Sequence, residues 1–132
     1  MSEAEIIEGL KKDEFIFFYQ PKISLVTGKV FGAEALLRWI KPDGSIIPPE
    51  AFIPVAEQST LIKDITLHMF PKLVNDMLLI MDVEALSISF NASARDFEDD
   101  VFTRMLLRVL EISQLPADCL QIELTETAAL AA

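Results

Sequence analysis

FGAEALLRW, residues 31–39, is an apolar run of strand length that carries a single acid, Glu34, and ends in Arg38 and the only tryptophan of the chain, Trp39. Burying a carboxylate among apolar neighbours costs free energy unless a cationic side chain or a metal ion meets it. We therefore expect Glu34 to have such a partner. The ordinary alternative is a structural ion pair with Arg38 or a lysine.

Two later stretches have the same design. Residues 86–91, LSISFN, end in Asn91, and residues 120–123, LQIE, end in Glu123. In a parallel α/β barrel the chemistry lies at the carboxyl ends of the strands, and oxygen ligands suit hard divalent cations. The pattern thus predicts that Glu34, Asn91 and Glu123 converge on one cation. Asn91 alone would more often be a turn former, and Glu123 part of an acidic helix start.

Apolar strands alternate with segments of helical spacing, which is typical of βα units. A turn at residues 26–29 predicts that the first two strands are antiparallel neighbours. The fold class is therefore α/β, a partial TIM-like βα barrel with an antiparallel first strand, because four strands do not close a barrel. Strands are expected at residues 14–20, 31–39, 86–91 and 119–124, and helices at 3–12, 49–58, 61–77, with a kink or restart at Pro71, and 101–112.

The composition narrows the classes of partner. The net charge of −10, from 11 basic and 21 acidic residues, argues against binding of DNA or RNA polymers, which depends on Lys and Arg. No apolar run reaches the roughly 18 residues of a membrane span, and the N-terminus is acidic, so we expect no direct membrane contact and no signal peptide. The single cysteine, Cys119, is expected to be buried and fits a reducing cytoplasm.

Four acids follow Asn91 at close intervals, namely Asp96, Glu98, Asp99 and Asp100. Such a cluster could attract a cation, but we interpret it as the solvated acidic start of the following helix. The hydrophobic share of 52% is high for a chain without a membrane segment. This surplus suggests that some apolar surface is covered by material outside this chain.

Several ordered motifs give the chain a specific resemblance over nearly its whole length. They are YQPKI (19–23), GAEALLRW (32–39), PPEAFIPVAEQSTLI (48–62), FNASARDF (90–97) and IELTET (122–127). Together they resemble the EAL domains, which hydrolyse or bind cyclic di-GMP in bacterial second-messenger signalling. The triplet that gives this family its name is residues 34–36.

The resemblance implies a modified TIM barrel with two Mg²⁺ or Mn²⁺ ions that activate a water against one phosphodiester bond, giving linear pGpG. By match to the family motifs, the metal ligands would be Glu34, Asn91 and Glu123, the substrate contacts Gln20, Leu36 and Arg38, and the residue that positions a ligand-bearing loop Glu126. Arg38 would bind phosphate. Glu126 would also support a homodimer.

The sequence departs from the family pattern in one large respect. The family continues with an Asp-Asp-Phe-Gly segment and with a later lysine, glutamate and glutamine, and residues 1–132 contain none of these. We expect the chain to be the N-terminal portion of a single EAL domain, with the C-terminal half missing and the catalytic set incomplete. Weak metal binding and no activity of the chain alone would follow. Two alternatives are a receptor that binds cyclic di-GMP without cleaving it, and a half-barrel that self-associates.

Overall fold

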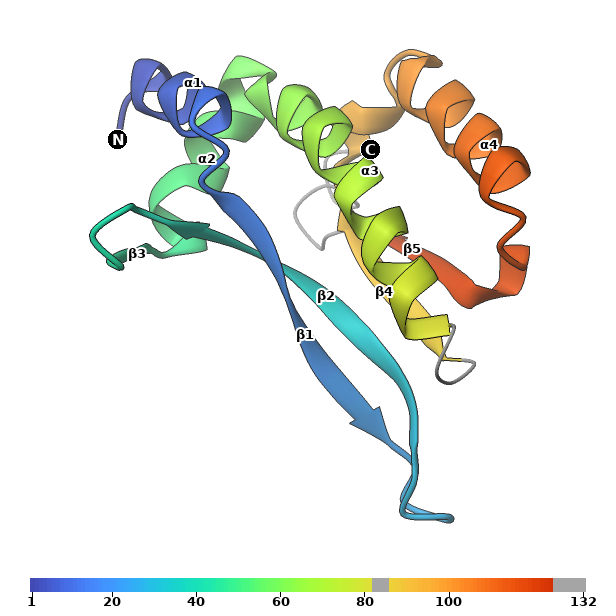
Figure 1. Ribbon diagram of the computed structural model, residues 1–132. Coiled ribbons are helices and arrows are strands. Elements are labelled where there is room, and N and C mark those ends of the chain that lie inside the picture. Colours follow the sequence, from blue (N-terminus) through green and yellow to red (C-terminus); the bar gives the residue numbers. More distant parts are fainter. Residues whose placement is uncertain (82–85, 125–132) are drawn as a thin grey trace.

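The structure is a computed structural model that describes residues 1–81 and 86–124 (Figure 1). The helices are α1 (Glu3–Lys11), α2 (Pro49–Ser59), α3 (Leu61–Met81) and α4 (Val101–Ser113), with short 3-10 helices η1 (Ala94–Phe97) and η2 (Ala117–Cys119). The strands are β1 (Phe15–Ile23), β2 (Val30–Ile40), β3 (Ile46–Ile47), β4 (Ser87–Ala92) and β5 (Leu120–Leu124).

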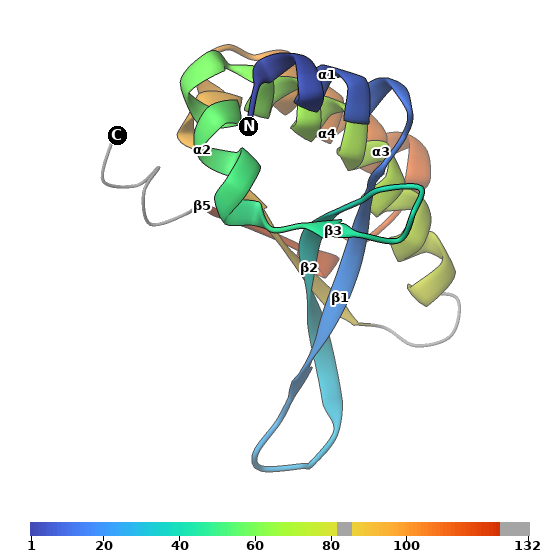
Figure 2. The same ribbon diagram turned by 90° about the vertical axis from the view of Figure 1, so that its left-hand side faces the viewer.

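One sheet joins all the strands in the order β1-β2-β4-β5, with the two-residue β3 also paired to β2. Strand β1 is antiparallel to β2, whereas β2, β4 and β5 are mutually parallel. The predicted antiparallel first strand is therefore confirmed, and β3 lies in a segment that the sequence had suggested was only a loop. The tip of the β1–β2 hairpin extends away from the helices (Figures 1 and 2).

The sheet has two unlike faces because successive side chains of a strand point to opposite sides. On β4, Ile88, Phe90 and Ala92 are buried against the helices, with Phe70 and Leu73 of α3 in the same cluster. The intervening residues of the strands point to the other side, which we call the open face. Toward the tip of the β1–β2 hairpin, no helix of the described residues lies against the sheet (Figures 1 and 2).

A second core cluster ties α1 and α2 to the start of the sheet. The ring of Trp39 lies 4.9 Å from that of Phe15 and 5.3 Å from that of Phe52, measured between centroids. The Trp39 indole Nε1 donates a hydrogen bond of 3.0 Å to Oε1 of Glu14, which Lys41 approaches at 3.5 Å. The Trp39 hydrogen bond is the main reason that the pKa of Glu14 is below its ordinary value. The buried indole thus has a fixed polar partner.

Helix α3 runs without a break through Pro71, so the predicted restart there was wrong. Proline removes one hydrogen bond of the helix, but Met69, Phe70, Leu73 and Val74 around it are all buried in the core. Their packing holds the helix together, and the exposed Pro71 ring faces solvent. Within the described ranges, 1–81 and 86–124, no helix is both long enough and apolar enough to cross a membrane.

Two glycines allow close approaches that a side chain would block. A Cβ atom at Gly32 would lie 2.5 Å from the backbone carbonyl oxygen of Ser87, where β2 pairs with β4. A Cβ atom at Gly9 of α1 would lie 2.8 Å from the ring of Trp39. The neighbour at Gly32 is backbone, which cannot move without shifting β4, whereas the neighbour at Gly9 is a side chain. A side chain at position 32 should therefore destabilise the fold more than one at position 9.

We predict that Gly32→Ala lowers the free energy of unfolding by about 1–3 kcal/mol or more, because β4 must move away from β2. Gly9→Ala should cost less, since the gain in helix propensity, about 1 kcal/mol, offsets part of the clash with Trp39. Urea unfolding of both variants measures the difference. A Gly32→Ala protein as stable as the wild type would contradict this account of the β2–β4 pairing.

Candidate functional site

Six of the seven predicted site residues lie on the open face, because their positions alternate with those of the buried residues. On β2 the open-face side chains are Glu34, Leu36 and Arg38, while Ala35 and Trp39 are buried on the other side. The open-face residues on the other strands are Gln20, Asn91 and Glu123, and strand register pairs Gln20 with Glu34 and Asn91 with Glu123. The seventh residue, Glu126, lies outside the described residues.

Among the described side chains, the one that hydrogen-bonds to Glu34 is the amide of Asn91. Asn91 Nδ2 donates a hydrogen bond of 3.1 Å to Glu34 Oε1 across the β2–β4 pair. Glu34 is only half-buried, since strand alternation turns it away from the apolar neighbours that surround it in sequence. No salt bridge to Glu34 occurs among the described residues, so the alternative of a structural ion pair with Arg38 or a lysine is not found there.

The oxygen atoms of Glu34, Asn91 and Glu123 belong to three neighbouring strands. Asn91 and Glu123 are directly paired and both exposed, and the Asn91 amide that contacts Glu34 leaves its own oxygen available. Two carboxylates and an amide oxygen form a donor set that fits Mg²⁺ or Mn²⁺. In residues 1–81 and 86–124 no three His, Cys, Asp or Glu side chains cluster, so any such site depends on the amide of Asn91.

A buried hydroxyl lies beside this donor set. Ser89 is paired with Glu34 in the register of β2 and β4, and its side chain is 1% exposed. Its Oγ has no hydrogen-bond partner within the part of the chain that the structure describes. An orphaned polar atom of this kind calls for an explanation such as a bound water or ion. The unbonded Ser89 Oγ is therefore consistent with a site that binds water or an ion beside Glu34.

Arg38 lies further along β2, toward its carboxyl end. One of its guanidinium nitrogens donates to the backbone oxygen of Leu37 at 2.8 Å, and the guanidinium carbon lies 5.9 Å from the centre of the Phe18 ring. None of the described carboxylates forms a salt bridge with Arg38. Most of its five N–H donors therefore remain available to an anion, and a planar guanidinium suits bidentate binding of phosphate.

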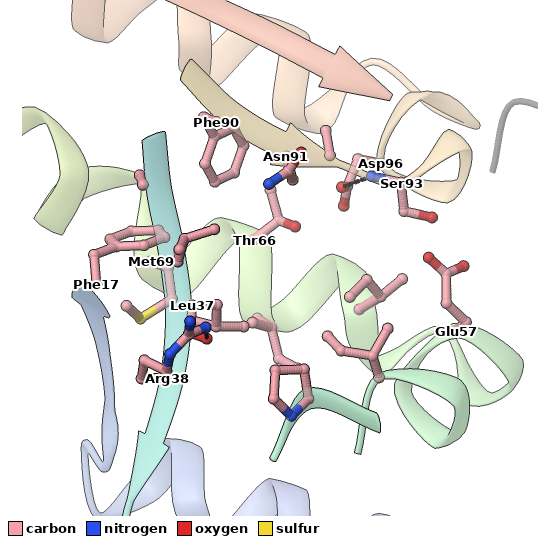
Figure 3. Close-up of a pocket in the computed structure, with 17 residues that line it drawn as sticks. Phe17, Leu37, Arg38, Glu57, Thr66, Met69, Phe90, Asn91, Ser93 and Asp96 are labelled. Carbon is pink, nitrogen blue, oxygen red and sulfur yellow. Dashed lines mark hydrogen bonds between the residues drawn. The ribbon is translucent and has the colours of Figure 1, made fainter. Parts of the chain in front are cut away.

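A cavity of about 260 Å³ adjoins this residue, between the ends of β2 and β4 and the helices α2 and α3 (Figure 3). Apolar side chains form most of its wall, among them Ile53, Ile62, Ile65, Met69 and Phe90. Its polar lining comprises Arg38, Glu57, Thr66, Asn91, Ser93 and Asp96. The cavity is thus a mostly apolar pocket that opens beside the Glu34 and Asn91 pair.

The interpretation of Asp96 as part of a solvated acidic cluster was wrong. Asp96 is 2% exposed, and its Oδ2 accepts a hydrogen bond of 2.9 Å from the backbone N–H of Ser93, closing a capping box at the start of η1. Glu98, Asp99 and Asp100 are exposed, as expected. The Ser-x-x-Asp pattern at residues 93–96 is the sequence signal that separates Asp96 from the other three acids.

Burial is the main cause that raises the pKa of Asp96 above its ordinary value of 3.8, and the negative charge of Glu57 adds to it. The backbone hydrogen bond from Ser93 and the neighbouring Thr66 hydroxyl act in the opposite direction. Of the pocket residues, Glu57, Thr66 and Asp96 were not identified as site residues from the sequence. Their positions in three separate segments explain this, since only the packing of α2, α3 and η1 unites them.

Known proteins share both the sequence pattern and the fold. The model of the EAL domain family matches residues 3–132. The signaling protein YkoW of Bacillus subtilis is 36% identical over 95% of this chain and 16% of YkoW. The cyclic di-GMP phosphodiesterase RocR of Pseudomonas aeruginosa is 29% identical over 99% of this chain and 34% of RocR. The PaMucR phosphodiesterase, solved in complex with c-di-GMP, superposes with a TM-score of 0.85 at 29% identity, over 96% of this chain and 52% of PaMucR. The chain therefore spans only part of each of these proteins.

The raised pKa of Asp96 leads to a pH-dependent prediction. A folded state that holds a proton more tightly than the unfolded state is favoured at low pH, and this contribution is lost as pH rises from below 3.8 through the raised pKa. Asp96→Asn lacks the titrating group, so its unfolding free energy relative to wild type should increase from about pH 3 to pH 7. Urea unfolding at a series of pH values measures the trend, with the exposed Asp64→Asn as a matched control. A constant difference between Asp96→Asn and wild type would contradict the prediction.

Proposed function

Because the chain belongs to the EAL domain family, we propose that it forms the N-terminal part of a metal-dependent site that binds and hydrolyses cyclic di-GMP. In this proposal Glu34, Asn91 and Glu123 hold a divalent ion, and Arg38 binds a phosphate of the nucleotide. Leu36 and Gln20 contact the nucleotide on the same face. Glu126 positions a loop that carries further ligands.

The observation that supports the proposal best is the contact between Glu34 and Asn91. These residues are 57 positions apart in sequence, yet their side chains meet at 3.1 Å on neighbouring strands, and Glu123 is paired in register with Asn91. A structural ion pair would not need an amide and a second carboxylate on the adjacent strands. A hard divalent ion needs several oxygen donors on one side of a sheet.

When bound, Mg²⁺ or Mn²⁺ would supply positive charge that stabilises the attacking and leaving oxygens of a displacement at phosphorus. The chain's own residues position the substrate around that charge. The planar guanidinium of Arg38 pairs with phosphate oxygens and fixes the phosphodiester relative to the three ligands. The net charge of −10 repels an anionic dinucleotide, so binding should depend on the divalent ion as well as on Arg38.

Residues 1–132 do not supply a complete catalytic set for this reaction. Three oxygen donors leave a divalent ion with several positions filled by water, and no basic residue of this chain is assigned to activate a nucleophile. We therefore propose that the chain alone recognises cyclic di-GMP without hydrolysing it, and that residues outside these 132 complete the enzyme. A cyclic dinucleotide signal also implies a cytoplasmic location.

We predict that calorimetry in the presence of Mn²⁺ detects binding of cyclic di-GMP to the 132-residue chain. Arg38→Ala should weaken this binding about tenfold or more, because a charge-assisted hydrogen bond to phosphate is lost. Arg104→Ala, which removes an exposed arginine of α4, is the matched control. Glu34→Ala should weaken the dependence on Mn²⁺.

The same samples are then assayed for linear dinucleotide product. No product is expected from the chain alone, and turnover that disappears in Glu34→Ala would show instead that the 132 residues form a complete enzyme. Absence of heat at ligand concentrations of several hundred micromolar would remove the proposed recognition of cyclic di-GMP.

The open face also favours a second candidate function, self-association. The outermost strands of the sheet, β1 and β5, each have one edge without a partner strand among the described residues. Ile16 and Phe18 of β1 and Leu124 of β5 are exposed large apolar residues near these edges. Exposed edges and apolar patches are prone to pair with another copy of the same chain. A homodimer would cover both.

We predict that the wild-type chain sediments as a dimer or larger species at micromolar concentrations. Phe18→Asp and Leu124→Asp should shift it toward monomer, because each places a charge in the apolar contact. Leu79→Asp, on the exposed surface of α3, serves as the control. A compact monomer of the wild-type chain at these concentrations would rule out this assembly.

A further inference from the structure

Only one of the two carboxyl oxygens of Asp96 accepts a hydrogen bond from the described residues. Oδ2 accepts the backbone N–H of Ser93, whereas Oδ1 is buried without a hydrogen-bond partner among residues 1–81 and 86–124. The Thr66 hydroxyl lies near this carboxyl but makes no hydrogen bond to Oδ1. Leaving a buried acceptor unsatisfied costs free energy, so Oδ1 can accept a hydrogen bond from a water or from a ligand that enters the pocket.

The position of this oxygen is informative because Asp96 lines the 260 Å³ cavity (Figure 3). The side chain is 2% exposed and shares the pocket wall with Thr66 and Phe90. A ligand group that reaches Asp96 would therefore be surrounded mainly by apolar side chains. Such surroundings accept a flat ring and strengthen any hydrogen bond that it makes to the carboxyl.

The size of the cavity restricts the group that it can hold. Pockets for whole drug-sized molecules run from about 300 to 1,000 Å³. At about 260 Å³ this cavity suits a single ring system rather than a complete dinucleotide. Arg38 lies at one side of the pocket and Asp96 at another (Figure 3). A phosphate at Arg38 and a base at Asp96 would therefore border the same pocket.

We propose that Asp96 is a specificity-determining residue, whose Oδ1 accepts a hydrogen bond from a ring N–H of a guanine base held in this pocket. The inference rests on the proposed function, since it assigns a base to the nucleotide whose phosphate meets Arg38. Guanine presents N1–H and an exocyclic N–H₂ side by side as donors. Adenine presents an acceptor at N1, which would face the Asp96 oxygen unfavourably.

The energetics favour strong discrimination by this residue. The carboxyl is removed from bulk solvent on folding, since Asp96 is 2% exposed, and this burial raises its pKa. A base with a donor restores the missing hydrogen bond, and a base without one leaves the acceptor unsatisfied beside a second acceptor. Sites that hydrogen-bond a ligand reject analogues lacking the donor far better than apolar pockets reject a change in size.

The test measures the affinity of the 132-residue chain for cyclic di-GMP and cyclic di-AMP in the presence of Mn²⁺. Wild type should prefer cyclic di-GMP, and Asp96→Asn should weaken cyclic di-GMP binding about 10- to 100-fold, because the amide places a donor where the carboxyl had an acceptor. The preference over cyclic di-AMP should shrink at the same time. Asp64→Asn, an exposed carboxyl of α3, is the matched control and should leave both affinities unchanged.

A second variant guards against misfolding of Asp96→Asn. Ile53→Phe fills part of the pocket from α2 without touching Asp96's capping bond, and it should also weaken cyclic di-GMP binding. Equal affinity of wild type, Asp96→Asn and Ile53→Phe for cyclic di-GMP would overturn the inference and leave the proposed function intact. If wild type fails to bind cyclic di-GMP, the proposed function is wrong. The role of Asp96 is then tested by measuring the binding of guanosine monophosphate. Binding of the mononucleotide that Asp96→Asn weakens would retain the base assignment, and no binding at millimolar concentration would remove it.

Discussion

The close approach of β2 to β4 at Gly32 is the constraint on which the site depends. The Ser87 carbonyl occupies space where any other residue at position 32 would place a Cβ atom. This contact begins a parallel ladder of four paired residues, which sets Glu34 opposite Ser89 and brings Asn91 within hydrogen-bond distance of Glu34. A shift of one residue would turn Asn91 into the core and Phe90 onto the open face. The register is thus fixed by backbone contact and by apolar burial together.

Burial and function are divided between the two faces of the same strands. The side chains that point toward the helices form the core with α3. The side chains on the open face include the proposed metal ligands and substrate contacts. The pocket lies where this division ends, at the carboxyl ends of β2 and β4, because there the chain leaves the sheet and η1 folds back over α3. The capping box of Ser93 and Asp96 stabilises the start of η1, where the chain turns back over α3. It also places the Asp96 side chain in the pocket wall.

Acids that look equivalent in the sequence have unlike environments in the structure. Asp96 is buried beside Glu57, and burial raises its pKa, whereas Asp99, three residues later, has a lowered pKa chiefly because the backbone N–H of Val101 donates to it. The periodicity of the flanking apolar residues identified the helices and strands to within a few residues. It could not separate these two aspartates, because their difference comes from the packing of η1 against α3.

The sequence by itself determined the order of the main elements, the antiparallel first strand and the oxygen donors at the ends of three strands, because apolar periodicity and turn chemistry are local properties. It also carried the family resemblance that the matched proteins confirm. Only the tertiary structure decided that Glu34 contacts the Asn91 amide rather than a basic side chain, that α3 continues through Pro71, and that Asp96 lies in a pocket. Each of these depends on contacts between residues far apart in the chain, which no local pattern encodes.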